Sequence, residues 1–390
     1  MSKWGRVKLG DYIQQIRGVS YKPKDTSDTA KENYVAILRA NNIQDEGLNL
    51  NNLIYVDRSK IYEQQFIKAG DIIVCSSSGS KNLVGKAAQA KKDMYVSFGA
   101  FCRVVRTNKI FAPYLGNFFK SQYYRRTISE FSSGANINNI RNEHIDRLLI
   151  PLPPLETQKQ IAKTLDTASE LLSMRRQQLA ELDNLIRSIF YDMFGDPVTN
   201  EKGWKLRKLS EVGMIERGVS KHRPRNDPSL LGGKYPLIQT GDVANADFII
   251  REYKQTYSDK GLSQSRMWKA GTLCITIAAN IAKTAILGFD ACFPDSVVGF
   301  NANQYTNNIF VLYWFTFFQK ILEAQAPESA QKNINLRILN ELRVIIPPIE
   351  LQNKFATIVT KIEAQKNLVK KAIEETQLLF DSLMSQYFDE

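Results

Sequence analysis

Residues 150–158 read IPLPPLETQ, and residues 346–352 read IPPIELQ. Each stretch places prolines directly ahead of a long segment that contains neither proline nor glycine. Proline is tolerated in the first turn of a helix because the N–H that it lacks would have no intrahelical partner there. The two stretches therefore predict the starts of two long helices, over residues 154–196 and 348–390.

The apolar residues of both segments recur at alternating steps of four and three, which is the spacing of a coiled-coil seam. In the first segment the seam positions are Ile161, Leu165, Ala168, Leu172, Arg175, Leu179, Leu182, Ile186, Ile189 and Met193. In the second they are Phe355, Val359, Ile362, Lys366, Val369, Ile373, Thr376, Phe380, Leu383 and Tyr387. Neither stripe is stable alone in water, so we expect the two helices to pack on each other as a coiled coil.

Further apolar residues widen both stripes beyond the seam. They are Leu171, Leu185, Phe190, Leu368, Leu378, Leu379 and Met384. Two interpretations stay open: a second protein docks on the helices, or the helix–helix core is wider than a simple seam.

The sequence on either side of the first segment is repeated. Residues 17–20 (RGVS) recur at 217–220, residues 68–70 (KAG) at 269–271, and residues 136–138 (NIN) at 333–335. A period near 200 residues is too long for a solenoid, so each copy is expected to be a whole domain. We call residues 1–153 copy one and residues 197–347 copy two.

Both copies alternate short buried strands with turns, which predicts a mixed α/β class. The predicted strands are residues 34–37, 71–75, 236–238 and 273–277, and one aromatic helix is expected in each copy, at 114–124 and 311–322. The aromatic residues of these helices, Phe118, Phe119, Tyr123, Phe315, Phe317 and Phe318, are expected in the core rather than as base-stacking platforms.

The positive charge is concentrated in the two copies. The chain carries +12, of which residues 1–153 carry +10 and residues 197–347 carry +6, whereas the two helical segments each carry −2. A basic domain attracts polyanions, and each neutralised phosphate releases counterions. Charge that served only solubility would not need this partition, so we expect nucleic acid as the ligand.

Polar and basic loops stand at matching points of both copies, although any one of their side chains could simply be solvated. Arg, Asn and Gln can bond base edges, whereas Ser and Lys mostly hold phosphates. The candidate DNA-contact residues of copy one are Arg39, Asn41, Ser76, Ser78, Lys81, Asn82, Asn136, Asn138 and Arg141. Those of copy two are Arg217, Lys221, Arg223, Thr240, Asn280, Lys283, Lys332, Asn333, Asn335 and Arg337.

Signals for other classes of protein are weak. The chain has no apolar run long enough for a membrane span and no signal peptide at its start, and Cys75, Cys102, Cys274 and Cys292 read as reduced core thiols of a cytoplasmic protein. No metal site or catalytic residue is predicted, since Gly79–Lys86 is only a near miss to a phosphate-binding loop. His144 and His222 have no evident acidic partner in the sequence. The chain is expected to bind without catalysing a reaction.

This layout resembles the specificity subunit of type I restriction–modification systems over essentially the whole chain. The resemblance rests on the doubled RGVS, KAG and NIN motifs and on the boundary IPLPPLETQKQIAKTLD, repeated as IPPIELQNKFATIVTKI. It implies that each copy is a target recognition domain for one half of a split, asymmetric DNA site. It also implies helices that set the spacing and bind two methyltransferase subunits, with restriction (motor) subunits joining the complex. S-adenosylmethionine and ATP with Mg²⁺ would then belong to the partners, and this chain would hold no cofactor.

The resemblance is weaker at one place, where residues 276–283 (TIAANIAK) replace the more family-like SSSGSKNLVGK of copy one. Two other classes of function are weighed against it. A self-sufficient enzyme acting on DNA or RNA would methylate or cleave by itself. A free-standing DNA-bridging or regulatory protein would bind tightly without any methyltransferase.

Overall fold

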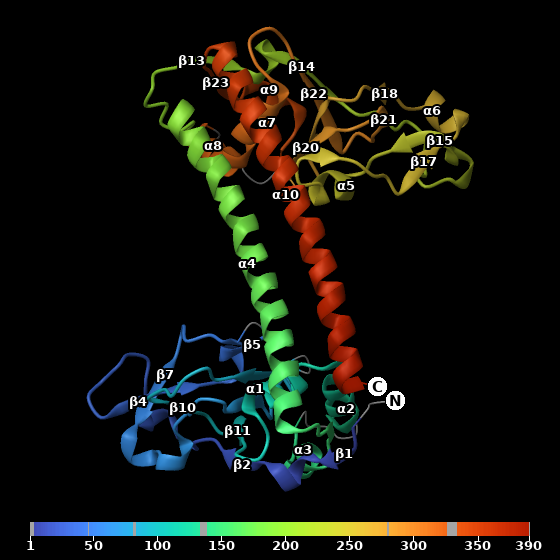
Figure 1. Ribbon diagram of the computed structural model, residues 1–390. Coiled ribbons are helices and arrows are strands. Elements are labelled where there is room, and N and C mark those ends of the chain that lie inside the picture. Colours follow the sequence, from blue (N-terminus) through green and yellow to red (C-terminus); the bar gives the residue numbers. More distant parts are fainter. Residues whose placement is uncertain are drawn as a thin grey trace. The chain divides into compact units, whose positions relative to one another are not determined.

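The computed structural model describes residues 4–45, 47–80, 83–132, 139–278, 281–325 and 334–389 of the chain (Figure 1). Lys81, Asn82, Asn136, Asn138, Asn280, Lys332 and Asn333 of the predicted site lie outside the described residues. The chain forms two compact units, residues 1–176 with 371–390 and residues 177–370. Each unit therefore holds one copy together with part of both long helices.

The described residues of copy one form small sheets and three short helices. One four-stranded sheet has the order β2 (Gln14–Arg17), β11 (Cys102–Arg106), β8 (Ile72–Cys75) and β9 (Ala87–Gln89). A second has the order β10 (Val96–Phe98), β4 (Tyr34–Leu38), β7 (Ile54–Asp57) and β3 (Thr26–Ser27). Two-stranded pairs join β1 (Arg6–Lys8) to β12 (Leu149–Pro151) and β5 (Ile43–Gln44) to β6 (Gly47–Leu48). The helices are α1 (Ala112–Phe118), α2 (Gln122–Ser132) and α3 (Asn142–Asp146).

Copy two repeats this plan with additions. Its larger sheet has the order β14 (Gly213–Arg217), β22 (Val297–Ala302), β19 (Leu273–Thr276), β20 (Thr284–Leu287) and β16 (Ile249–Ile250). Its second sheet has the order β17 (Gln255–Tyr257), β15 (Leu231–Leu237), β21 (Ala291–Cys292) and β18 (Met267–Trp268), and β13 (Lys205–Lys208) pairs with β23 (Arg343–Ile346). The helices are α5 (Thr240–Asn245), α6 (Asp259–Ser263), α7 (Asn308–Trp314), α8 (Phe318–Gln325) and α9 (Leu336–Glu341).

The mixed α/β class is confirmed, and the four predicted strands correspond to β4, β8, β15 and β19. The prediction of one aromatic helix in each copy is wrong, because α1 and α2 are separate helices and a 3-10 turn divides α7 from α8. In copy one the break follows from a local cap, in which the buried Ser121 hydroxyl accepts a hydrogen bond from Tyr124 N at 3.1 Å. Ser121 thus acts as the N-terminal cap of α2, which begins at Gln122, whereas α1 ends at Phe118.

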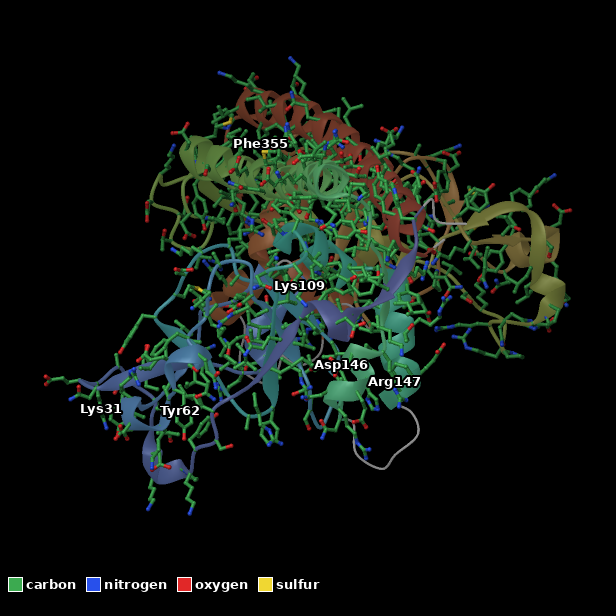
Figure 2. The ribbon with its side chains drawn as sticks, turned by 60° about the horizontal axis from the view of Figure 1, so that its bottom comes forward. Lys31, Tyr62, Lys109, Asp146, Arg147 and Phe355 are labelled. Atoms are coloured by element: carbon green, nitrogen blue, oxygen red, sulfur yellow. The ribbon has the colours of Figure 1, made fainter. Side chains whose placement is uncertain are left out.

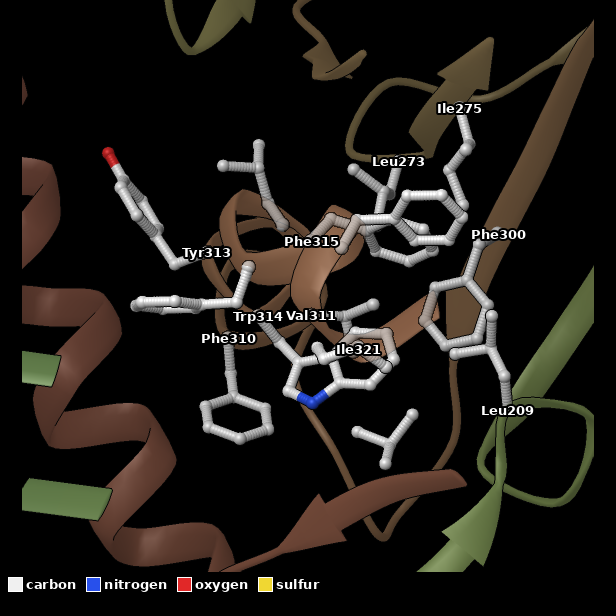
Figure 3. Packing of buried hydrophobic residues seen from close by; sticks show 14 of the residues in the cluster. Leu209, Leu273, Ile275, Phe300, Phe310, Val311, Tyr313, Trp314, Phe315 and Ile321 are labelled. Atoms are coloured by element: carbon white, nitrogen blue, oxygen red, sulfur yellow. The ribbon is translucent and has the colours of Figure 1, made fainter. Parts of the chain in front are cut away.

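The aromatic residues of these helices form the cores, as expected. Phe118, Phe119, Phe315, Phe317 and Phe318 are buried, and Tyr123 is partly buried against the same cluster. Figure 3 shows the second core, in which Val311 and Trp314 of α7 lie on the side of Phe300 of the larger sheet. Phe310 points away from that sheet and packs on Phe190 and Phe194 of α4.

The repeated KAG motif marks a sharp entry into a buried strand. Gly70 and Gly271 have φ of +87° and +86°, a conformation that a residue with a side chain rarely adopts. The alanine N–H before each glycine donates to an aspartate, from Ala69 to Asp93 at 2.8 Å and from Ala270 to Asp290 at 2.9 Å. The motif therefore fixes the start of β8 and of β19.

The glycine of RGVS is required by close backbone packing. A Cβ atom on Gly18 would lie 2.1 Å from the carbonyl oxygen of Gly99, and one on Gly218 would lie 2.3 Å from that of Phe293. The RGVS segment at the end of β2 therefore packs directly on the turn before β11, and the RGVS segment at the end of β14 packs on the turn before β22.

The two long helices are α4 (Leu155–Phe194) and α10 (Ile349–Met384), which continues as the π-helical turn η10 (Ser385–Asp389). In the first unit Ile161 and Leu165 of α4 share a core with Met384 and Phe388, and Arg175 donates to Thr376 Oγ1. In the second unit Asp183 pairs with Lys366 at 2.6 Å, and the Phe190 ring packs on Phe355. Within each unit, residue numbers rise along α4 as they fall along α10, so the helices pack antiparallel.

Every seam position of the two helices is at least partly covered. Ile161, Leu165, Leu172, Ile186, Phe355, Val359 and Ile362 are buried, and Leu179, Leu182, Ile189, Val369, Ile373, Phe380 and Leu383 are half-buried. Of the residues beyond the seam, Phe190 and Met384 lie in the cores, whereas Leu171, Leu185, Leu368, Leu378 and Leu379 are exposed. The wider-core interpretation thus holds for two of these residues, and the other five are exposed to solvent.

A buried glutamine explains the doubled boundary motif. Gln158 Oε1 accepts from Phe111 N at 2.9 Å, and its Nε2 donates to Pro153 O at 2.8 Å. Gln352 repeats these bonds, accepting from Thr306 Oγ1 at 2.8 Å and Asn307 N at 3.2 Å and donating to the carbonyls of Tyr305 and Pro347. Each glutamine joins the first turn of a long helix to the start of a core helix in its own copy.

Replacing Gln352 with Ala should lower the free energy of unfolding by about 2–4 kcal/mol, because several buried polar groups lose their partners. Gln158→Ala should cost less, since this side chain makes two bonds to the first unit. Chemical denaturation measures both, with Gln160→Ala at an exposed position of α4 as the common control. Equal stability of Q352A and Q160A would contradict this role.

Candidate nucleic-acid interface

A cavity of about 570 Å³ lies at the edge of the β2–β11–β8–β9 sheet of copy one. It is lined by the end of β2, the exit of β8, the start of β11 and the start of α3. Arg17, Arg103 and Arg141 contribute three positive charges to its lining, against one negative charge from Glu143. Arg17 and Arg141 are exposed, and Arg141 lies 3.5 Å from Glu143. The cavity is therefore basic and open to an anionic ligand.

Arg103 organises the residues around this cavity. Its guanidinium donates to Gln15 Oε1 at 2.7 Å, to Ile140 O at 2.9 Å and to Asn142 Oδ1. Gln15 in turn donates to Asn142 O at 2.9 Å and to Asp146 Oδ1 at 2.7 Å. Burial, followed by the nearby charge of Arg17, lowers the pKa of Arg103. Arg103 thus joins β2, β11 and the start of α3, and it fixes the position of the segment that carries Arg141.

A second cavity of about 530 Å³ lies beside the first and shares Ser77, Phe101 and Cys102 with it. Arg39 and Asn41 line it, together with Ser78. Asn41 is exposed, whereas Arg39 is half-buried and donates to Asn52 O at 3.0 Å. The two cavities bring together Arg39, Asn41, Ser78 and Arg141 of the predicted residues at one edge of copy one.

Ser76 has a supporting place in this edge. It is buried, and its hydroxyl donates to the carbonyl oxygen of Phe101 at 3.0 Å. Its own carbonyl accepts from Ile140 N at 2.7 Å. Ser76 therefore connects the turn at Phe101 with the residue that precedes Arg141.

Copy two uses its basic loop differently. Arg225 bonds Asp295, and Arg223 lies 3.6 Å from the same carboxylate while donating to Ser220 O at 2.6 Å. Lys221 and Arg217 are exposed beside them. Two arginines of the loop are thus partly neutralised by one aspartate, which leaves Arg217 and Lys221 as the more available cations.

The other predicted residues of copy two lie on separate elements. Thr240 is the first residue of α5, and Lys283 is exposed directly before β20. Asn335 caps α9 by accepting from Ile338 N at 3.0 Å, and Arg337 is exposed on that helix. The cavity beside α5 in copy two is lined by none of these four residues.

The alignment of the two NIN motifs is corrected by the structure. Leu9 N donates to Leu148 O and Leu209 N to Leu342 O, so the two copies are related here by an offset of 194 rather than 197. The buried Ile334 then corresponds to the buried Ile140, and Asn335 to Arg141. The repeated asparagines before Ile140 permit the misleading alignment, because a shift of three residues matches the same letters.

The two histidines also differ from expectation. His222 does have an acidic partner, since its Nε2 lies 3.1 Å from Asp227 Oδ2. Hydrogen bonds from Ser229, and then from His222, hold the pKa of Asp227 at about 2. His144 Nδ1 accepts from Arg141 N at 3.3 Å. Both histidines therefore stabilise loop ends.

Within the described residues, no group of His, Cys, Asp or Glu side chains could hold a metal ion, and no helix is long and apolar enough to cross a membrane. All four cysteines are free and buried. Burial raises the pKa of Cys75 to about 11 and that of Cys102 to about 12, so both thiols stay protonated at neutral pH.

Several residues of the copy-one edge were missed by the sequence prediction: Gln15, Arg17, Phe101, Arg103 and Asn142. Arg17 could have been found, because it is the repeat partner of Arg217. Arg103 and Gln15 sit inside strands, where sequence patterns give no sign of a polar network. Phe101 has no aromatic counterpart in copy two, so the repeat does not reveal it.

The family model of the type I restriction modification DNA specificity domain matches the chain twice, over residues 1–184 and 201–377. The chain is 37% identical to the type I restriction enzyme StySPI specificity subunit of Salmonella potsdam, over 97% of this chain and 86% of that protein. It is 26% identical to the EcoKI specificity subunit of Escherichia coli K12, over 99% of this chain and 88% of that protein.

The fold is similar to that of the type I restriction–modification S subunit from M. genitalium. The TM-score is 0.64 at 15% identity, and the alignment covers 99% of this chain and 96% of that one. A chain from a structural study of complex assembly and conformational transition in a type I system aligns with a TM-score of 0.56 at 16% identity, over 99% and 97% of the two chains.

Arg103→Ala should loosen the segment around Ile140, because it removes hydrogen bonds from a charged donor that contribute about 1.5–3 kcal/mol each. Hydrogen–deuterium exchange should rise at residues 139–146, with a smaller change in β4 and β7. Arg147→Ala is the matched control, since Arg147 is exposed at the far end of α3. Exchange in R103A equal to that in R147A would show that Arg103 does not hold this segment.

Proposed function

This chain belongs to the family of type I restriction–modification DNA specificity domains, and from that premise we propose that its two copies read the two halves of one split DNA target. The observation that carries the proposal is the tandem match of one DNA-specificity domain to residues 1–184 and 201–377. The family assignment makes the chain a non-catalytic DNA-recognition subunit. Neither a self-sufficient enzyme nor a free-standing bridging protein is favoured by it.

Different loops on a shared scaffold support the reading of unequal half-sites. The order β2–β11–β8–β9 of copy one recurs as β14–β22–β19–β20 in copy two. Yet copy one presents Arg17, Arg39 and Arg141, whereas copy two binds two arginines of its loop to Asp295. Since direct readout depends on the side chains that reach base edges, copies with different loops should prefer different bases. The target would therefore be asymmetric.

The proposed division of labour follows the four segments of the sequence. Residues 1–153 and 197–347 would recognise DNA, and residues 154–196 and 348–390 would set the spacing between the half-sites. Helices of this length are about 60 Å long at ~1.5 Å per residue. The paired seam supports this role because it resists bending better than a single helix.

Partner subunits would supply the chemistry. The family implies DNA together with the methyltransferase and restriction subunits of a type I complex, and we propose two methyltransferase subunits, one for each half-site. Five exposed leucines on the long helices, including Leu368 and Leu378, support a docking surface. S-adenosylmethionine and ATP with Mg²⁺ would be bound by those partners, in the cytoplasm where the chromosome is accessible.

Exchanging residues 1–153 for the corresponding domain of another specificity subunit should change one half of the methylated sequence and leave the other half intact. Long-read mapping of methylated bases in a host carrying the exchanged chain measures this directly, with the unmodified chain as the control. A change in both halves, or in neither, would contradict independent reading by the two copies.

Inserting one helical turn of about four residues, roughly 6 Å, between residues 161 and 193 should lengthen the spacer by one or two base pairs or abolish methylation. The matched control inserts the same residues into the exposed loop at 252, which leaves both helices and the basic loop of copy two unchanged. Methylation mapping of both variants decides the point. An unchanged spacer in an active helix-insertion variant would show that the helices do not set the distance.

A further inference from the structure

Phe101 is an apolar side chain that copy one holds out of its core. It is 69% exposed, although Phe98, three residues earlier, is fully buried. It stands in the turn between β10 and β11, at the edge shared by the two basic cavities. A single exposed phenylalanine needs no explanation by itself. The backbone bonds that hold Phe101 in this turn, and the cations around its ring, do call for an explanation.

The turn is fixed by its backbone and not by the ring. The Phe101 carbonyl accepts from Ser76 N at 2.9 Å, Ser77 N at 3.1 Å and Ser76 Oγ at 3.0 Å. On the other side of the turn, the Gly99 carbonyl lies so close to Gly18 that Gly18 cannot carry a Cβ atom. Any residue at position 101 can make these backbone bonds, so folding does not require an aromatic side chain there.

Cations flank the ring on both sides. Arg17 and Arg141 line the cavity on one side, and Arg39 lines the cavity on the other, with Asn41 beside it. Arginines in this arrangement can hold phosphates on either side of a bound duplex. An apolar ring gains nothing from a phosphate, so its favourable contact with the same ligand is with the bases, either their faces or a thymine methyl group.

Copy two lacks this feature at the equivalent position. In copy one, Ser76 N donates to Phe101 O, and in copy two, Ile277 N donates to Ser296 O. Because these two bonds stand at matching points of the sheets, Ser296 is the counterpart of Phe101. The neighbouring Asp295 binds the arginines of its own loop. The same turn therefore presents an aromatic ring in one copy and a neutralised, polar surface in the other.

We propose that Phe101 is a base-contacting specificity residue of copy one, whose ring packs against the bases of that copy's half-site while the surrounding arginines hold the phosphates. This inference rests on the proposed function and deepens it, because it names a reading residue that belongs to one half-site alone.

The test compares Phe101→Ala with Phe101→Trp in the complete chain assembled with its methyltransferase subunits. Tyr62→Ala is the matched control. Tyr62 is 73% exposed, lines neither cavity, and is drawn well apart from Asp146 and Arg147 of α3 in Figure 2. Fluorescence anisotropy measures binding to a duplex with the mapped target and to a mixed-sequence duplex, at two salt concentrations. Variants of the target carry uracil for thymine or 2-aminopurine for adenine in each half-site.

F101A should bind the target about 5- to 100-fold more weakly, as expected for the loss of an aromatic contact with bases. Its salt dependence and its affinity for the mixed-sequence duplex should be unchanged, and F101W should bind like the unmodified chain. The lost preference should fall in the copy-one half-site. If uracil weakens binding of the unmodified chain but not of F101A, the ring contacts the thymine methyl group. If the fluorescence change of 2-aminopurine on binding is lost in F101A, the ring contacts a base face.

Three results would overturn the inference. In the first, F101A binds and discriminates like Y62A, whereas the unmodified chain reads its target, so that the proposed function stands without this residue. In the second, F101A loses methyltransferase subunits in the absence of DNA, which makes Phe101 a protein contact. In the third, the unmodified complex shows no preference for the mapped duplex, and the proposed function fails together with the inference.

Discussion

A buried glutamine at the first turn of each long helix connects that helix to the copy before it, and the rest of each unit depends on this connection. Gln158 bonds the chain just before α1, and Gln352 bonds the chain just before α7. Because both side chains are buried, a shift of either helix would leave hydrogen-bonding groups without partners in the core. The orientation of the helix start relative to its own domain is therefore fixed.

The helix pair combines an apolar seam with a few buried polar contacts. Lys366 is 6% exposed and reaches Glu363 at 2.7 Å, and Tyr313 Oη donates to the same carboxylate at 2.8 Å. Lys366 also reaches Asp183 of α4 at 2.6 Å. Burying charges is costly unless they are paired, so the pairing of Lys366 with Asp183 favours one register of α4 against α10. A seam of leucines alone would slide by a heptad at a smaller cost.

The two copies illustrate how one scaffold can present unequal surfaces. RGVS and KAG are retained because a glycine must fit against a backbone or adopt a positive φ, and both requirements concern the fold. The turn that RGVS packs against uses only backbone atoms for its hydrogen bonds to the neighbouring strand, so its side chains can differ between the copies. It carries Phe101 in copy one and Asp295 next to Ser296 in copy two, so the side chains differ while the backbone bonds of the turn recur.

The sequence by itself determined the doubled architecture, the mixed α/β class, the two long helices and the basic character of both copies. These properties depend on local periodicity, on proline and glycine, and on net charge, all of which can be read along the chain. Tertiary structure alone decided which polar residues meet. Arg103, Gln15 and Asn142 are distant in the sequence and converge only because β2, β11 and α3 are neighbours. The break between α1 and α2 and the offset at Ile140 likewise depend on hydrogen bonds and burial, which sequence patterns do not encode.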